Sequence, residues 1–255
     1  MQQPTTLGVI PARMGSTRYP GKPLQPIHGR PMLWHVWKRS ALAGVLDTLV
    51  IATCDEEIRV AAEAFGARVV MTSSAHIRAG DRVAEVASRL PADIVLNIQG
   101  DEPLVHPDHI VQVVAAFEGR PDVVCVNPIA PIVDDEDLES PNSVKVVCDL
   151  AGRALYFSRY PVPSPWINPR ESPVYRQVPI LGFRRQFLLD LAALPETPLE
   201  RVESVDLLRA LEHGYPVHVV KTEHQTVGVD VPADVPRVER LLDSDPVYRR
   251  YAERG

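Results

Sequence analysis

A glycine-containing loop with three cationic side chains directly follows the first apolar run of the sequence. The loop spans residues 11–23 (PARMGSTRYPGKP) and carries Arg13, Arg18 and Lys22. Its backbone N–H groups can approach an anion, and its cations can make charge-assisted hydrogen bonds to phosphate oxygens. The loop has neither the GxxxxGK[ST] spacing of a Walker A motif nor the GxGxxG spacing of dinucleotide-binding loops. We expect it to bind a triphosphate whose leaving pyrophosphate gains negative charge; the alternative is a surface turn with scattered cations.

The charges of the chain are distributed unevenly. The net charge is −6, which argues against general nucleic-acid binding. The first acidic residue is nevertheless Asp47, and six cations precede it: Arg13, Arg18, Lys22, Arg30, Lys38 and Arg39. Such a run in an acidic protein predicts a local field that attracts anions. A solvated basic face is the alternative interpretation.

Two separate segments offer aspartate side chains that could hold a metal ion. The segment QGDEP (99–103) contains Asp101, and GVDVP (228–232) contains Asp230. Carboxylate oxygens suit Mg²⁺, and two aspartates brought together with a triphosphate can chelate one or two ions. Each segment also has a purely structural interpretation, an ordinary turn for the first and a helix N-cap at Asp230 for the second.

The elements that must position these residues alternate between apolar strands and amphipathic helices. We expect strands over 6–11, 47–53, 67–71 and 93–98, and helices over 31–43, 56–65, 81–90 and 107–117. This alternation is typical of βαβ units and predicts an α/β fold with a mostly parallel, Rossmann-like sheet covered on both faces. Ligands bind beyond the carboxyl ends of such strands. The loops 11–23 and 99–103 are therefore expected to meet at that edge.

The second half of the chain is less regular. We expect an acidic loop over 134–139, antiparallel strands over 143–148 and 154–158, helices over 187–194 and 203–211, a strand over 217–221 and a final helix over 235–242. The sequence therefore predicts a single α/β domain over residues 1–255, with an inserted smaller α+β lobe at about 130–220.

Four segments together resemble a known family. PARMGSTRYPGKPL, NIQGDEPLV, NSVKVV-D--G-ALYFSR-PVP and GVDVPADV, in this order, are similar to motifs of the CMP-Kdo synthetases (3-deoxy-manno-octulosonate cytidylyltransferases) over about residues 7–242. The resemblance implies a fold of the nucleotide-diphospho-sugar transferase type, a homodimer, Mg²⁺ as cofactor, and attack of an acceptor oxygen on the α-phosphorus of CTP. It implies these site residues: Arg13, Ser16, Arg18 and Lys22 at the CTP phosphates, Gln99 near the nucleotide, and Asp101 and Asp230 at the metal.

Further positions match the family only in part. His76 and Arg82 match the ends of its H-x-S-G-T-[DE]-R segment, in which Arg78 replaces the serine. The resemblance places Asn142 and Lys145 at the base of the inserted lobe.

The departures concentrate in segments that the family uses for the sugar acid. In RQVPILGFR (176–184), which ends in Arg184, Gln177 replaces a histidine, and Leu181 and Phe183 replace tyrosines. A later segment retains Glu203 but has Leu207 where the family has glutamine. A site built for hydroxyl groups discriminates against ligands that lack them. We therefore hypothesise an acceptor with fewer hydroxyls and more negative charge, such as a small phosphonate; ordinary drift in a Kdo enzyme stays open.

The sequence as a whole predicts a CTP-dependent cytidylyltransferase that acts on a small anionic acceptor, with Arg13, Lys22 and Asp101 as its catalytic residues. One alternative is a non-catalytic nucleotide-binding protein that retains the fold. Another is a nicotinamide-dependent oxidoreductase, against which the missing GxGxxG speaks. Neither a bilayer-spanning apolar run nor a signal peptide is evident, and the three cysteines form no CxxC pair. We therefore expect a cytoplasmic protein without membrane partners.

Overall fold

The chain divides into two compact units in the computed structural model, which describes residues 4–15, 19–164 and 173–252. The first unit combines Met1–Val111 with Thr226–Gly255, and the second spans Gln112–Gln225. The range expected for the inserted lobe, about 130–220, falls within the second unit. A single domain with an insert stays a prediction.

A parallel sheet forms the centre of the first unit. Its strands follow the order β5-β4-β1-β6. Their bounds are β1 (Thr6–Pro11), β4 (Thr48–Thr53), β5 (Arg68–Met71) and β6 (Ile94–Ile98). Val9 of β1 is in register with Val50 of β4 and with Asn97 of β6. Both β1 and β6 are buried along their whole length, as expected for strands covered on two faces. The predicted parallel sheet is confirmed.

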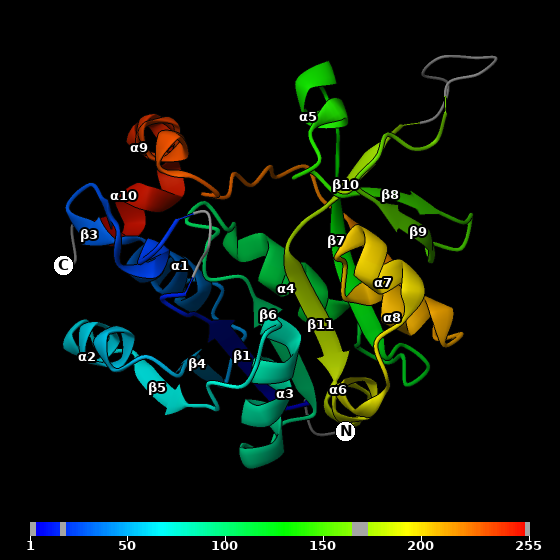
Figure 1. Cartoon of the computed structure of the whole chain (residues 1–255), viewed down its shortest axis with the longest axis horizontal. Coiled ribbons are helices and arrows are strands. Elements are labelled where there is room, and N and C mark those ends of the chain that lie inside the picture. The colour runs from blue at the N-terminus through cyan, green and yellow to red at the C-terminus, as the bar shows by residue number, and fades with distance from the viewer. Residues whose placement is uncertain (1–3, 16–18, 165–172, 253–255) are drawn as a thin grey trace. The chain divides into compact units, whose positions relative to one another are not determined.

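One amphipathic helix follows each of these strands or the loop after it, and the helices lie on both faces of the sheet (Figure 1). They are α1 (Met32–Ala41), α2 (Glu56–Ala64), α3 (Ala79–Arg89) and α4 (Pro107–Ala115), the last of which begins in the first unit. Helix α3 buries Val83 and Val86 while Ser88 and Arg89 stay exposed. All four helices were predicted to within two residues at either end. The α/β fold class is therefore confirmed.

The C-terminal segment completes the first unit. The 3-10 helix η2 (Pro232–Asp234) leads into α9 (Val235–Ser244) and α10 (Pro246–Ala252). Leu242 of α9 belongs to a core cluster with Ile27 from the short hairpin β2 (Pro26–Ile27) and β3 (Arg30–Pro31). Arg39 of α1, almost fully buried, pairs with Asp245 and donates to the carbonyl oxygen of Val105 at 2.6 Å. These contacts hold the chain beyond β6, which carries one of the predicted metal ligands, against the helices.

The second unit contains mostly antiparallel strands. They are β7 (Cys125–Pro131), β8 (Lys145–Cys148), β9 (Ala154–Ser158), β10 (Tyr175–Gln177), β11 (Ile180–Arg184) and β12 (His218–Lys221). Five of them follow the order β11-β7-β10-β8-β9, and β12 runs parallel to β7. The antiparallel pairing of β8 with β9 confirms the prediction for 143–148 and 154–158. The strands β7, β10 and β11 were not predicted.

Two local predictions for this unit are wrong. Residues 134–139 are not a loop, because Asp135–Glu139 form helix α5. The carboxylate of Asp134 accepts the N–H of Asp137 at 2.7 Å, and acidic residues in a first turn favour a helix. The single helix expected over 203–211 is two helices, α7 (Pro198–Glu203) and α8 (Leu207–Glu212). Ser204 adopts a left-handed conformation with φ 53°, which ends α7.

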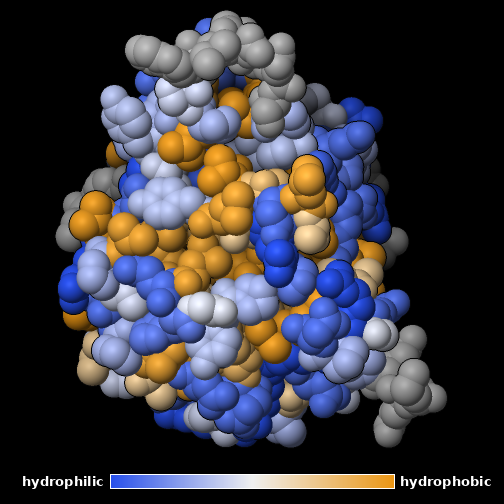
Figure 2. Space-filling model, turned by 90° about the vertical axis from the view of Figure 1, so that its right-hand side faces the viewer, coloured by the Kyte–Doolittle hydropathy of each residue, from blue (hydrophilic) through white to orange (hydrophobic). Residues whose placement is uncertain are grey.

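Helix α6 (Arg185–Ala193) completes the elements of the second unit. The unit also has an exposed apolar surface. Figure 2 shows apolar side chains gathered on the face of the molecule that contains β8, β9 and α7. Leu155 of β9 and Val202 of α7 are 62% and 82% exposed. A contiguous exposed apolar patch marks an interaction surface more often than chance.

Among the described residues, no helix combines the length and the apolar character that crossing a bilayer requires.

Candidate active site

A cavity of about 290 Å³ opens at the carboxyl ends of the strands of the first unit. Three loops line it, and each follows a strand: the loop after β1, the loop between β5 and α3, and the loop after β6. The lining residues with chemistry are Arg13, Lys22, His76, Arg78, Arg82, Gln99 and Asp101. The structure thus brings seven of the predicted site residues together. Ligand pockets of roughly 300–1,000 Å³ are usual, and such strand ends are where α/β sheets bind ligands.

The close approach of two loops explains why a glycine precedes Asp101. A side-chain carbon at position 100 would lie 2.6 Å from the carbonyl oxygen of Pro11, so only glycine fits there. Beyond Gly100, the carbonyl oxygen of Asp101 accepts the N–H of Val229 at 3.0 Å. This hydrogen bond brings the segment that contains Asp230 alongside the loop after β6. Asp230 itself is not among the residues that line the cavity, so a site shared by both aspartates stays a prediction.

Lys22 occupies the centre of this convergence. Its ammonium lies 2.7 Å from Oδ2 of Asp101 and 2.7 Å from the carbonyl oxygen of Val229. The lysine side chain is 11% exposed and that of Asp101 39%. Gly21, with φ 72°, makes the turn that directs Lys22 inward, and its N–H donates to the carbonyl oxygen of Met14 at 3.1 Å. One cation therefore bridges the two segments that carry the predicted metal ligands.

The loop after β1 is also anchored by a carboxylate from the neighbouring strand end. The carboxylate of Asp55, directly after β4, accepts the N–H of Met14 at 2.7 Å. The neighbouring Arg13 is exposed and lines the cavity. Ser16 and Arg18 lie outside the described residues.

Arg82 forms part of the cavity wall from the first turns of α3. Its side chain is buried, and its guanidinium donates to the hydroxyl of Thr72 and to Sγ of Cys54 at 3.5 Å. Arg78 stands at the N-terminus of the same helix and also lines the cavity. Among the described lining residues, the cavity thus has four cationic side chains and one carboxylate, that of Asp101; the cationic residues are Arg13, Lys22, Arg78 and Arg82. An excess of cationic side chains of this kind favours an anionic ligand.

His76 is held by a residue that sequence analysis missed. Its Nε2 lies 2.6 Å from Oε2 of Glu85, a carboxylate of α3 that is itself 16% exposed. Burial raises the pKa of Glu85, but hydrogen bonds from Ser73 and His76 and the charge of Arg89 outweigh it and lower that pKa below its ordinary value. The signal was present in the sequence, because Glu85 follows Arg82 by three residues and so shares its face of a predicted helix.

The remaining predicted residues lie in the second unit. Lys145 is fully buried, and its ammonium donates to the carbonyl oxygens of Ser140, Ser143 and Arg159 at 2.6, 2.7 and 3.0 Å. Burial lowers the pKa of Lys145. Because an ammonium has three protons, these contacts use all of its donors. Asn142, which is exposed, lies in the same turn and donates its N–H to Oγ of Ser140 at 3.3 Å.

Glu203 and Lys145 both contact the backbone of Arg159. The carboxylate of Glu203 accepts the hydroxyls of Tyr156 and Ser158 at 3.1 Å each and the N–H of Arg159 at 2.7 Å. Gln177 lies in β10. The residue before it, Arg176, is in register with Lys145 of the neighbouring strand β8.

Arg184 makes its contacts elsewhere in the second unit. It stands at the end of β11 and donates to the carbonyl oxygens of Phe117 and Arg120 at 2.9 and 3.1 Å and of Val123 at 3.3 Å. Its guanidinium is thereby committed to backbone groups.

The departures from the family differ in character. Leu181, Phe183 and Leu207 are all buried core residues of the second unit. Phe183 stacks on Phe187 with ring centroids 6.4 Å apart. These three substitutions therefore affect the packing of the core of the second unit, whereas Arg78 adds a charge to the cavity of the first unit.

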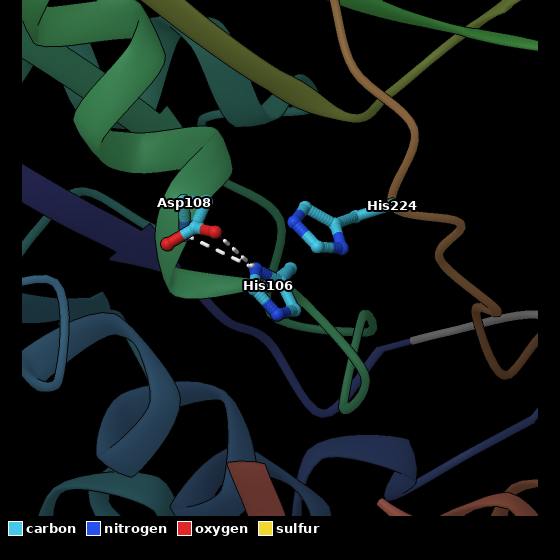
Figure 3. Close-up of side chains that lie close together, drawn as sticks. All are labelled: His106, Asp108 and His224. Carbon is cyan, nitrogen blue, oxygen red and sulfur yellow. Dashed lines mark hydrogen bonds and ion pairs between the residues drawn. The ribbon is translucent and has the colours of Figure 1, made fainter. Parts of the chain in front are cut away.

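One polar group outside the cavity has a local structural role. Nδ1 of His106 accepts the N–H of Asp108 at 3.2 Å and lies 3.6 Å from the carboxylate of that residue (Figure 3). These contacts tie the turn before α4 to the first turn of the helix.

Comparisons with known proteins identify relatives of this chain. Residues 7–223 match the family model described as "Cytidylyltransferase". The chain is 48% identical to a 3-deoxy-manno-octulosonate cytidylyltransferase of Solibacter usitatus, over 92% of this chain and 94% of the relative. It is 45% identical to one of Myxococcus xanthus, over 95% and 98%.

Solved structures show the same relationship. A CMP:2-keto-3-deoxy-manno-octonic acid synthetase complexed with CTP superposes with a TM-score of 0.88 at 35% identity, covering 94% of this chain and 98% of that one. A 4-diphosphocytidyl-2C-methyl-D-erythritol synthase from Anaerococcus prevotii, at 13% identity over 95% and 100% of the two chains, shares the fold with a TM-score of 0.63. The resemblance to the CMP-Kdo synthetases is confirmed. This chain belongs to the cytidylyltransferase family and is a nucleotidyltransferase.

Proposed function

We propose that this enzyme transfers CMP from CTP to 3-deoxy-manno-octulosonate (Kdo) or a closely related sugar acid and releases pyrophosphate. The observation that carries the proposal is the cavity at the strand ends, which four cationic side chains line together with Asp101. The names of the full-length relatives support the acceptor, and the CTP complex of the structural neighbour supports the donor. No observation favours the nicotinamide-dependent oxidoreductase or a binding protein without catalysis.

The proposed reaction is an in-line displacement at the α-phosphorus of CTP. The acceptor oxygen forms a bond to that phosphorus while the bond from phosphorus to the leaving pyrophosphate breaks. We propose that Arg13 and Lys22 stabilise the charge that develops on the pyrophosphate, because both line the cavity and fixed cations act most strongly where charge develops. Arg82, buried and held by Thr72, is positioned to orient the nucleotide without moving. Gln99 supplies an uncharged donor and acceptor on the same wall.

We further propose that Mg²⁺ is the cofactor and that Asp101 and Asp230 hold it. A carboxylate oxygen of Asp101 and the carbonyl oxygen of Val229 already contact one cation, the ammonium of Lys22, at 2.7 Å each. Hard oxygen donors of this kind fit Mg²⁺. When bound, the metal supplies charge neutralisation at the phosphates. Lys22 competes for the same oxygen of Asp101 until a triphosphate offers its ammonium another partner.

Lys22→Met is expected to tighten the binding of Mn²⁺ to the nucleotide-free protein by about tenfold. The competing charge-assisted hydrogen bond, about 1.5 kcal/mol, is then absent. Electron paramagnetic resonance of free Mn²⁺ measures the affinity without any turnover. The matched control is Lys38→Met, because Lys38 packs on Trp37 outside the cavity. This variant is expected to leave the Mn²⁺ affinity unchanged. Equal Mn²⁺ affinities in wild type and Lys22→Met would refute this competition.

An acceptor panel tests the function itself. Pyrophosphate release is measured with CTP and, in turn, Kdo, a less hydroxylated 2-keto acid and a small phosphonate. Kdo is expected to give the highest kcat/KM, because the apolar departures at Leu181, Phe183 and Leu207 are core positions rather than cavity positions. A phosphonate used clearly better than Kdo would replace the proposed acceptor, and no release with any acceptor would favour a binding protein.

Two further proposals concern the setting of the enzyme. We propose a homodimer, supported by the exposed apolar surface that β8, β9 and α7 share (Figure 2). We propose that it works in the cytoplasm, since Cys54, Cys125 and Cys148 are free thiols, the state that a reducing compartment maintains.

A further inference from the structure

A carboxylate outside the cavity organises one of its walls. Glu85 lies in α3, and its Oε2 accepts the N–H of Ser73 at 2.9 Å and contacts Nε2 of His76 at 2.6 Å. Its other oxygen pairs with Arg89 one turn further along the helix. His76 lines the cavity, whereas Glu85 does not. Glu85 can therefore reach a ligand only through the residues that it holds.

The loop that Glu85 contacts joins β5 to α3 and carries His76, Ile77 and Arg78 into the cavity. Its first residue is anchored, because the N–H of Thr72 donates to the carbonyl oxygen of Thr53 at 2.8 Å. Beyond Ser73, the contact between Glu85 and His76 links α3 to the middle of this loop. The carboxylate therefore ties this part of the cavity wall to the helix.

The chemistry of this pair is well defined. Hydrogen bonds and the charge of Arg89 outweigh burial and lower the pKa of Glu85, so the carboxylate is ionised at neutral pH. A carboxylate only accepts hydrogen bonds, so Nε2 of His76 must carry a proton in both the neutral and the charged imidazole. The ring therefore has one orientation and, when neutral, one tautomer. A ligand in the cavity meets a preorganised imidazole rather than a rotating one.

We propose that Glu85 is a positioning residue of the donor site, which sets the affinity for CTP by holding His76 in the cavity wall. The inference rests on the proposed function, since CTP is the ligand. It assigns a role to a residue that contacts no substrate. It also predicts that the role depends on His76 and disappears without it.

A double-mutant cycle tests this dependence. Glu85→Gln keeps the shape of the side chain but removes its charge, and we expect the Kd for CTP, measured by titration calorimetry, to rise about tenfold, the order of one charge-assisted hydrogen bond. In a His76→Ala background the same change is expected to alter the Kd less than about twofold, because coupled residues are non-additive. An equal rise in both backgrounds means that Glu85 does not act through His76 and overturns the proposal.

A matched control and a spectroscopic readout separate positioning from general stability. Glu63→Gln removes the same kind of helical ion pair, with Arg59 on α2, and is expected to leave the Kd unchanged. The ¹⁵N shifts of the His76 ring are expected to show a protonated Nε2 in the wild type and a mixture of tautomers in Glu85→Gln. An unchanged ring signature in that variant contradicts the proposal.

The remaining outcomes are equally decisive. A wild type that does not bind CTP overturns the proposed function, whereas a wild type and a Glu85→Gln variant that bind CTP equally overturn only this inference. If Glu85→Gln does not fold, His76→Gln breaks the pair from its partly exposed side. An unchanged Kd for CTP in His76→Gln then refutes the positioning role.

Discussion

Asp101→Asn is expected to lower kcat by about a thousandfold while leaving the fold intact. A metal ion contributes several kcal/mol of charge stabilisation to the transition state, and each 1.36 kcal/mol corresponds to a factor of ten. Asparagine retains the shape of the side chain, which is 39% exposed, so little packing is lost. Lys22 keeps its contact with the carbonyl oxygen of Val229. Pyrophosphate release at saturating CTP, Mg²⁺ and acceptor measures the change.

The control for this variant is an aspartate of the same unit that lies outside the cavity. Asp243 in α9 has a side chain that is 67% exposed and contacts His28, and Asp243→Asn is expected to retain wild-type turnover. CTP binding and circular dichroism of Asp101→Asn show whether any loss comes from catalysis rather than from folding. Near-normal turnover of Asp101→Asn would remove Asp101 from the proposed metal site.

Arg209→Met is expected to lower the free energy of unfolding by about 3–5 kcal/mol, the usual cost of breaking a buried ion pair from one side. Glu200 is fully buried in the second unit, and Arg209 contacts its two carboxylate oxygens at 2.8 and 2.7 Å. Methionine fills part of the volume but leaves the carboxylate without its charged partner. Urea denaturation followed by circular dichroism measures the loss.

Two further variants show that the cost comes from the uncompensated charge. Replacing both partners, as Glu200→Met with Arg209→Met, is expected to recover much of the stability, because no buried charge then remains. Arg59→Met removes an arginine that pairs with Glu56 and Glu63 on the exposed face of α2, and it is expected to change stability little because exposed ion pairs contribute little. A loss in Arg209→Met no larger than that in Arg59→Met would contradict the argument.

The sequence by itself determined which segments of the first unit form strands and helices and which loops meet at the strand ends. Apolar strands and amphipathic helices have local periodicities, and a parallel sheet brings its strand ends to one edge. For this reason the loop with Arg13 and Lys22 and the loop with Asp101 were expected to meet, and both line one cavity. Local signals failed at Ser204, whose left-handed conformation no periodicity reveals.

Only the tertiary structure decided what surrounds each of these residues. Lys22 contacts Asp101 and Val229, which are 79 and 207 positions away in the chain. Lys145 reads as a binding residue by its motif, yet its ammonium is saturated by three backbone carbonyls. The partner of a charge and the burial of a side chain depend on segments that meet only on folding, and neither has a local signature. The spacing of Glu85 from Arg82 is visible in the sequence, but its contact with His76 is decided only by the fold.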